Sequence, residues 1–152
     1  MLHVVLQAPA PLGEVDVYVT HLTAGGEKVR SAQSLAVASV IKETRGKGPL
    51  LLIGDFGDVP GSATIEPLVE SGLVDLAADA PVNTCCRDGV LGEMPPLTTR
   101  TSHIFGTGWL GPQLTTFAGK PRKRADGSLL YASDHDGIFA VFPVRPADQQ
   151  PP

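Results

Sequence analysis

The stretch LLLIGDFGDVPGS, residues 50–62, contains the feature that decides how this chain is interpreted. Its first four residues are a continuous apolar run, which is typical of a strand buried on both faces of a sheet. The run ends in Asp55-Phe56-Gly57, the letters of the metal-binding loop of protein kinases. A kinase also needs a strand lysine motif and a His-Arg-Asp catalytic loop, and neither occurs in residues 1–54. The sequence therefore excludes a kinase and leaves a strand-end carboxylate to be explained.

Length and composition predict a single folded domain. The chain has 152 residues, of which 42% are hydrophobic and 18% are charged, a composition typical of globular proteins. We predict one domain over residues 1–145 and a flexible tail over residues 146–152. The net charge of −4 argues against a general nucleic-acid-coating protein. A nucleic-acid partner stays open but is not indicated.

The chain shows no sign of a membrane or secretory segment. No apolar run approaches the ~18 residues of a membrane span, and the start MLHVVLQAPAP lacks the basic region of a signal peptide. The two cysteines, Cys85 and Cys86, are adjacent and cannot form an ordinary disulfide framework. We therefore expect a cytoplasmic protein without a membrane span.

Alternation and apolar runs predict the strands. Residues 14–20 place alternate valines on one face, and residues 3–7 are the predicted hairpin partner across a proline-containing turn. Residues 49–55 form the buried strand of the opening stretch. Further strands are predicted at 103–106, 113–118 and 136–144, and loops at 85–101 and 119–132.

Two helices are predicted. Residues 27–45 are amphipathic and end at Gly46. Ser62 is expected to cap a short helix that Gly72 ends. The predicted buried stripe of the longer helix consists of Val29, Ala32, Ala36 and Val40, widened by Leu35 and Ile41.

Polar side chains lie at the ends of three predicted strands. His21 follows the first, Asp55 ends the second, and Asp134 with His135 precede the last. A sheet fixes such groups while the adjoining loops leave them open to substrate. Taken singly, a strand-end histidine is more often structural, and an aspartate before a turn is more often a cap. Together, two imidazoles and two carboxylates favour a hydrolytic centre that polarises water or holds a divalent metal.

The order of five motifs resembles the endonuclease/exonuclease/phosphatase superfamily, the group of pancreatic deoxyribonuclease, apurinic endonucleases, sphingomyelinases and inositol-phosphate phosphatases. The resemblance runs from about residue 4 to residue 144, and the segment NTCC is similar to the sphingomyelinase-like branch. The motifs are VDVYVTHL, the helix residues Arg30 and Gln33, LLLIGDFGDVPGS, TRTSHIF and SDHDGIFAVFPV.

The resemblance implies a role for each matching residue. His21 resembles the histidine that contacts the scissile phosphate, and Asp55 resembles the aspartate that activates the attacking water. His135 resembles the catalytic imidazole, and Asp134 the carboxylate that supports it near the metal. The remaining implied roles are substrate binding by Gly57, Ser102 and Arg100, Mg²⁺ or Mn²⁺ binding by Asp134 and Asp55, and structural support by Arg30 and Gln33.

Three departures from the family pattern concern the site itself. Gly57 stands where the family has a phosphate-binding Asn, and Ser102 stands where it has an orienting Asp. His103 is an alternative to that Asp, although a core histidine is the more frequent outcome. The magnesium-binding Glu of the family has no counterpart, since no acidic residue precedes Glu14. Two interpretations stay open: half of an enzyme that another chain completes, or a degenerate relative.

Three further features have weaker interpretations. The basic segment 119–127 could contact phosphates, although a solvated loop is the more frequent outcome. Cys85 and Cys86 could form a soft-metal or redox pair, against the commoner buried packing. Trp109 is expected to be a core residue rather than a ligand anchor.

We therefore expect an α/β chain with a mixed, mostly antiparallel sheet and helices on one face, resembling half of the family's four-layer sandwich. The predicted function is metal-dependent hydrolysis of a phosphodiester or phosphomonoester, with an incomplete active site. The alternative is a non-catalytic, pseudoenzyme-like binding or assembly module. Because the helices cover one face of the sheet, we also predict a homodimer through the other, apolar face.

Overall fold

A computed structural model of the chain describes residues 1–10, 12–78, 83–92, 97–107, 113–117 and 121–141. Its main sheet has five strands in the order β1-β2-β3-β5-β4. Only the β2–β3 pair is parallel, and the other three pairs are antiparallel. The predicted mixed, mostly antiparallel sheet is therefore confirmed. The strands are β1 (Leu2–Ala8), β2 (Gly13–His21), β3 (Leu50–Asp55), β4 (Val74–Asp75) and β5 (Ser102–Gly106).

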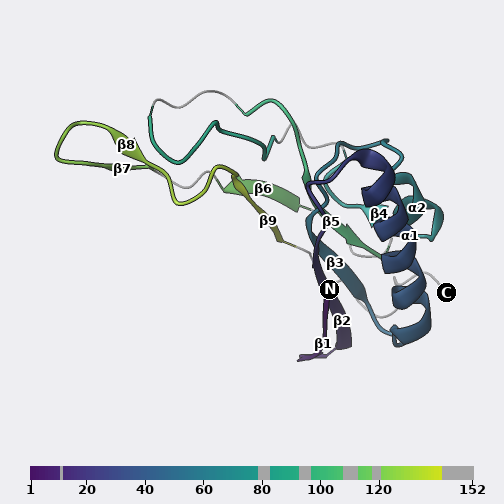
Figure 1. The fold of residues 1–152 in the computed structure, drawn as a ribbon. Coiled ribbons are helices and arrows are strands. Elements are labelled where there is room, and N and C mark those ends of the chain that lie inside the picture. The colour runs from purple at the N-terminus through teal and green to yellow at the C-terminus, as the bar shows by residue number, and fades with distance from the viewer. Residues whose placement is uncertain (11, 79–82, 93–96, 108–112, 118–120, 142–152) are drawn as a thin grey trace.

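Helix α1 (Glu27–Thr44) connects the parallel strands β2 and β3, and α2 (Glu66–Glu70) follows β3. Both helices lie on one face of the sheet, as predicted (Figure 1). Their apolar side chains enclose the core with the helix-facing residues of the strands. The main members of this core are Tyr18, Val37, Ile41, Leu50, Leu52, Phe56, Leu68 and Phe105.

The predicted buried stripe of α1 is wrong by about one residue, except at Ile41, which is buried as predicted. Val29 is 53% exposed and Val40 39% exposed, whereas Ser34, Val37 and Ile41 are buried. Val37 and Ile41 pack into the core with the strand residues, and Gln33 Oε1 accepts a hydrogen bond from the backbone N–H of Thr23. These tertiary contacts set the rotation of α1 about its axis. The sequence left that rotation open, because small alanine side chains lie on more than one face of the helix and either face could be buried.

The short helix α2 begins later than predicted. Its N-cap is Ile65, and the backbone carbonyl of Ser62, rather than its hydroxyl, accepts hydrogen bonds from Ile65 and Glu66. Ser62 is therefore not the cap, since residues before Ile65 form turns. The helix ends as predicted at Gly72, whose φ of +93° is favourable only for glycine.

The remaining strands form two small ribbons. Strand β6 (Gln113–Phe117) pairs with β9 (Gly137–Val141), and β7 (Arg122–Lys123) pairs with β8 (Leu129–Leu130). The β7–β8 hairpin projects away from the helices (Figure 1). The loop predicted over 119–132 therefore contains a hairpin, whose turn has Gly127 at φ +86°. Residue 118, Trp109, the strand end at 142–144 and the tail 146–152 lie outside the described residues.

The face of the sheet opposite α1 is apolar across three strands. The strand registers align Leu2, Val4 and Leu6 of β1 with valines of β2, and these in turn with Leu51 and Ile53 of β3. Leu2 is 59% and Leu6 is 50% exposed. Leu51 and Ile53 are half-buried, so β3 is fully buried on its helix face alone. None of the described helices combines the length and the apolarity needed to cross a membrane.

Candidate active site

Strand register brings the predicted catalytic residues to one end of the sheet. The parallel β2–β3 pair aligns His21 with Asp55, and the antiparallel β3–β5 pair aligns Asp55 with Ser102. The loop before β9 adds Asp134 and His135 from the other end of the sequence. These five residues line one open cleft of about 780 Å³. The structure therefore brings together four strand-end groups that are up to 114 residues apart in sequence.

Asp55 lies between the two imidazoles. Its Oδ2 atom is 3.9 Å from His21 Nε2 and 3.8 Å from His135 Nδ1. Its Oδ1 atom accepts a hydrogen bond of 2.9 Å from the backbone N–H of Gly57. Because Oδ1 is held in this way, Oδ2 is the oxygen that faces the two histidines. His21 is the accessible member of the set, with a side chain 75% exposed.

Asp134 is in the cleft but has a different environment from the one implied by the family pattern. It is exposed, and its Oδ1 accepts a weak hydrogen bond of 3.4 Å from the Ser133 hydroxyl. His135 instead faces Asp55 through Nδ1 and Cys86 through Nε2. The nearest carboxylate support for the imidazole in the described residues is thus Asp55 rather than Asp134.

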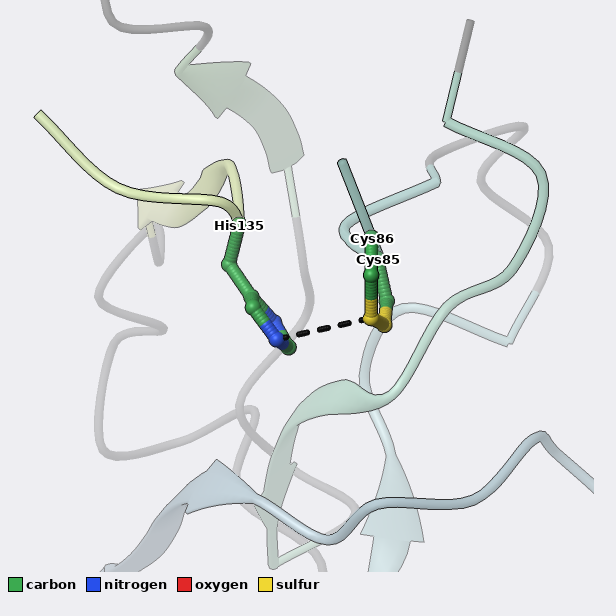
Figure 2. A group of neighbouring side chains, drawn as sticks. All are labelled: Cys85, Cys86 and His135. Atoms are coloured by element: carbon green, nitrogen blue, oxygen red, sulfur yellow. Dashed lines mark hydrogen bonds between the residues drawn. A yellow bond between two sulfur atoms is a disulfide. The ribbon is translucent and has the colours of Figure 1, made fainter. Parts of the chain in front are cut away.

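Cys85 and Cys86 line the same cleft, a position that the sequence did not predict. The two sulfurs are joined in a disulfide, and Cys86 Sγ lies 3.5 Å from His135 Nε2. Figure 2 shows both cysteine side chains pointing toward the imidazole. No sequence pattern could place them there, because the contact joins residues 49 positions apart.

Arg100 does not reach the cleft. It is 5% exposed and makes two hydrogen bonds to the carboxylate of Asp75. His103 completes this buried group: its Nδ1 is 3.0 Å from Asp75, and its Nε2 donates to the backbone carbonyl of Asp58. Burial acts to raise the pKa of Asp75, but hydrogen bonds from His103 and Arg100 outweigh it and lower the pKa from 3.8 to about 2. His103 is a core residue, as the more frequent outcome predicted.

A second ion pair supports the loop after β3. Arg30 of α1 bonds to Asp58 at 2.9 Å, and Thr64 donates to the same carboxylate oxygen. Burial acts to raise the pKa of Asp58, but these hydrogen bonds lower it overall. Arg30 also lines the cleft. Together with the His103 contact to Asp58, the pair holds the segment that contains Asp55 and Gly57.

A third ion pair supports the loop before β9. Arg87 is buried, bonds to Asp136 and stacks on the ring of Tyr131 at 4.5 Å from its centroid. Its backbone N–H also bonds to the carbonyl of Asp134. The loop with Asp134 and His135 is therefore attached to the segment that contains the cysteines.

The described residues do not complete a magnesium site. Asp55 and Asp134 both line the cleft, but among the described residues neither belongs to a group of three candidate ligands whose ligand atoms all lie within 4.8 Å of one another. Magnesium requires near-octahedral oxygen ligands. Within the described ranges, the one cluster of three candidate ligands is Cys85, Cys86 and His135, whose sulfurs suit a softer ion.

Solved structures provide the comparison for this fold. No protein-family model matches the chain, and no curated protein matches it. An endonuclease/exonuclease/phosphatase family protein from Bacteroides thetaiotaomicron aligns with a TM-score of 0.71 and 22% identity, over 86% of this chain and 51% of that chain. A mannosyl-6-phosphatase from the same species aligns with a TM-score of 0.65 and 21% identity, over 86% of this chain and 52% of that chain. Sphingomyelinase C from Streptomyces griseocarneus aligns with a TM-score of 0.60 and 17% identity, over 91% of this chain and 56% of that chain.

The chain thus spans about half the length of these solved structures. At such identities the alignments establish the backbone arrangement rather than the chemistry. The chain has the fold of one half of an endonuclease/exonuclease/phosphatase domain.

Proposed function

We propose that the chain is a phosphoesterase of the endonuclease/exonuclease/phosphatase superfamily and supplies the acid–base part of its active site. The observation that supports this most directly is Asp55, whose free oxygen faces His21 and His135 in an open cleft. A carboxylate between two imidazoles suits proton transfer in hydrolysis. The solved structures of this fold include a mannosyl-6-phosphatase and a sphingomyelinase C.

The proposed roles follow from the contacts of each side chain. Asp55 Oδ2 orients the attacking water and accepts its proton, since Oδ1 is already occupied by the Gly57 N–H. His21 donates to a phosphate oxygen, because its exposed ring is open to substrate. His135 returns a proton to the leaving group. Ser102 offers a hydroxyl to the phosphate at the same end of the sheet. Arg100 is left out of the substrate-binding set because Asp75 occupies its guanidinium.

The described residues supply only some of the ligands that a catalytic divalent ion would need. Mg²⁺ or Mn²⁺ would neutralise charge on the phosphoryl group, and Asp134 and Asp55 are the carboxylates available for it. Since the described residues complete no such site, the remaining ligands would have to come from outside the described residues.

Hydrolysis of bis-p-nitrophenyl phosphate tests the proposal. We expect release of p-nitrophenol that Mg²⁺ or Mn²⁺ stimulates and EDTA abolishes, and loss of this release in Asp55→Asn. Asp126→Asn is the matched control, because Asp126 lies in the turn of the β7–β8 hairpin and is 59% exposed. Hydrolysis that is equal in wild type and Asp55→Asn would contradict the assignment.

The alternative function is phosphate binding without turnover. Gly57 lacks the donor side chain of the family pattern, and the loss of one preorganised donor lowers rates by about 10²–10³. In this case inorganic phosphate shifts the NMR signals of the His21 ring while no p-nitrophenol forms. The two functions are therefore distinguished by the same pair of measurements.

We also propose that a second copy of the chain covers the apolar sheet face. The exposed Leu2, Leu6 and Val19 would form part of an apolar patch that isolated soluble proteins rarely expose. The aligned part of this chain makes up 51% and 52% of two of the solved structures, so those proteins have further chain that a second copy would stand in for beside the sheet. A two-fold contact needs only one self-complementary surface.

A further inference from the structure

We propose that reduced Cys85 and Cys86, together with His135, form a binding site for a thiophilic divalent cation such as Zn²⁺. The site lies in the cleft but uses different ligands from the predicted magnesium site. Within the described residues, these three side chains are the one group whose candidate ligand atoms all lie within 4.8 Å of one another (Figure 2).

The spacing of Cys86 Sγ and His135 Nε2 suits tetrahedral zinc. With Zn–S bonds of about 2.3 Å and Zn–N bonds of about 2.0–2.1 Å, a sulfur and a nitrogen on one tetrahedral ion are separated by about 3.6 Å. The observed separation of Cys86 Sγ and His135 Nε2 is 3.5 Å. This pair can therefore hold a zinc ion with little movement of either side chain.

The orientation of the imidazole also suits a zinc ligand, although its Nδ1 and the Asp55 oxygen would have to approach by about 0.6 Å to form a hydrogen bond. Its Nε2 faces the sulfurs, while its Nδ1 faces the carboxylate oxygen of Asp55 at 3.8 Å. A zinc-bound histidine typically donates its other ring N–H to a carboxylate or carbonyl. Two thiolates balance the charge of the ion. The cleft leaves the fourth position open to water, which is the arrangement of an accessible rather than a closed zinc site.

The disulfide makes the site dependent on reduction. While the two sulfurs are bonded to one another they cannot both be thiolate ligands. A water-soluble phosphine transfers two electrons to the disulfide and becomes its oxide with an oxygen from water, and the S–S bond breaks to give two thiols. Zinc then displaces the two thiol protons, and the sulfurs separate to about 3.8 Å on a tetrahedral ion.

Binding would also affect the chemistry of the cleft. A zinc ion on Nε2 occupies the nitrogen of His135 that points away from Asp55, so the imidazole could no longer transfer protons from that atom. This consequence rests on the proposed phosphoesterase function. Cation binding itself does not, because it depends only on the three ligands.

Cobalt provides a direct spectroscopic test. The full chain is reduced with a phosphine, its two thiols are verified by titration, and Co²⁺ is added. We expect sulfur-to-cobalt charge-transfer absorption that saturates at one ion per chain and is displaced by Zn²⁺. The oxidised chain is the matched sample and should show no such band. A reduced chain with two free thiols and no band would overturn the proposal.

Variants identify the ligands. In Cys86→Ser the band should weaken, and in both Cys86→Ser and His135→Ala the zinc Kd should rise by more than about tenfold. His21→Ala is the control, since it removes an exposed imidazole of the same cleft that is outside the cluster, and its zinc Kd should equal that of the wild type. Equal zinc affinity in wild type, Cys86→Ser and His135→Ala would also overturn the proposal. Thermal unfolding of each variant verifies that it is folded, and hydrolysis assays are not needed for this test.

Discussion

Replacing Asp75 by Asn should destabilise the protein and do so in a pH-dependent way. The carboxylate is 8% exposed, and Arg100 and His103 beside it are 5% and 0% exposed. The pKa of Asp75 is lowered from 3.8 to about 2, with burial opposing and the hydrogen bonds from His103 and Arg100 producing the shift. A difference of nearly two pKa units corresponds to about 2 kcal/mol of folding free energy at neutral pH.

The lowered pKa of Asp75 determines how its contribution to stability changes with pH. Because the folded pKa lies below the unfolded one, the stabilisation is fully present well above pH 3.8 and is lost as the pH falls toward 2. At pH 3 about 1 kcal/mol of it should already be gone. The Asn amide also places N–H groups against the Arg100 donors, which leaves a buried guanidinium uncompensated, and this raises the expected loss at pH 7 to about 2–5 kcal/mol.

Urea unfolding at pH 7 and at pH 3 measures both quantities. We expect the difference between wild type and Asp75→Asn to shrink by about 1 kcal/mol between the two pH values. Asp88→Asn is the control, since Asp88 is exposed, and its stability should follow the wild type. A loss below about 0.5 kcal/mol at pH 7, or a difference that is equal at both pH values, would refute the reasoning.

Three further predictions concern the cleft and the sheet face. Asp55→Asn and His135→Ala should each lower the rate of bis-p-nitrophenyl phosphate hydrolysis at least about 10²-fold. Rates of p-nitrophenol release equal to that of the wild type would contradict their roles. Gly57→Asn should raise the rate or the phosphate affinity, because the φ of +65° at this position is one that asparagine tolerates, and the Arg30 side chain, whose Cδ would lie 3.0 Å from the new Cβ, must shift to admit it; the absence of any gain would indicate that the phosphate pocket is lost. Sedimentation at low micromolar concentration should show a dimer that buries more than about 1,200 Å² and that Leu6→Lys dissociates while the helix variant Val29→Lys does not; a wild-type monomer would exclude this assembly.

The sequence alone predicted the longer strands, but not β4, β7 or β8, and it predicted the polar strand-end residues of the cleft, but not its two cysteines. Alternating valines in β2 and the apolar run of β3 predict strands because the side-chain period of a strand is local. The polar residues that end these strands meet because strand register brings their ends to one edge of the sheet. His21, Asp55, Ser102, Asp134 and His135 were therefore predictable as neighbours before any coordinates.

Side-chain partners depended on the tertiary structure. The rotation of α1 was ambiguous in sequence, and the contact of Gln33 with the loop after β2 decided it. Arg100 looked available for substrate until the fold placed it against Asp75 of the unpredicted strand β4.

The contact between Cys86 and the His135 imidazole also depended on the tertiary structure. Cys86 and His135 are far apart in sequence and belong to irregular loops, whose paths no local periodicity specifies. Local patterns thus determined which residues form strands and which polar groups end them. Only the packing of those elements decided that Asp55 faces two histidines and that a pair of cysteines lies against one of them, because long-range contacts between loops arise from the whole fold rather than from any neighbouring residues.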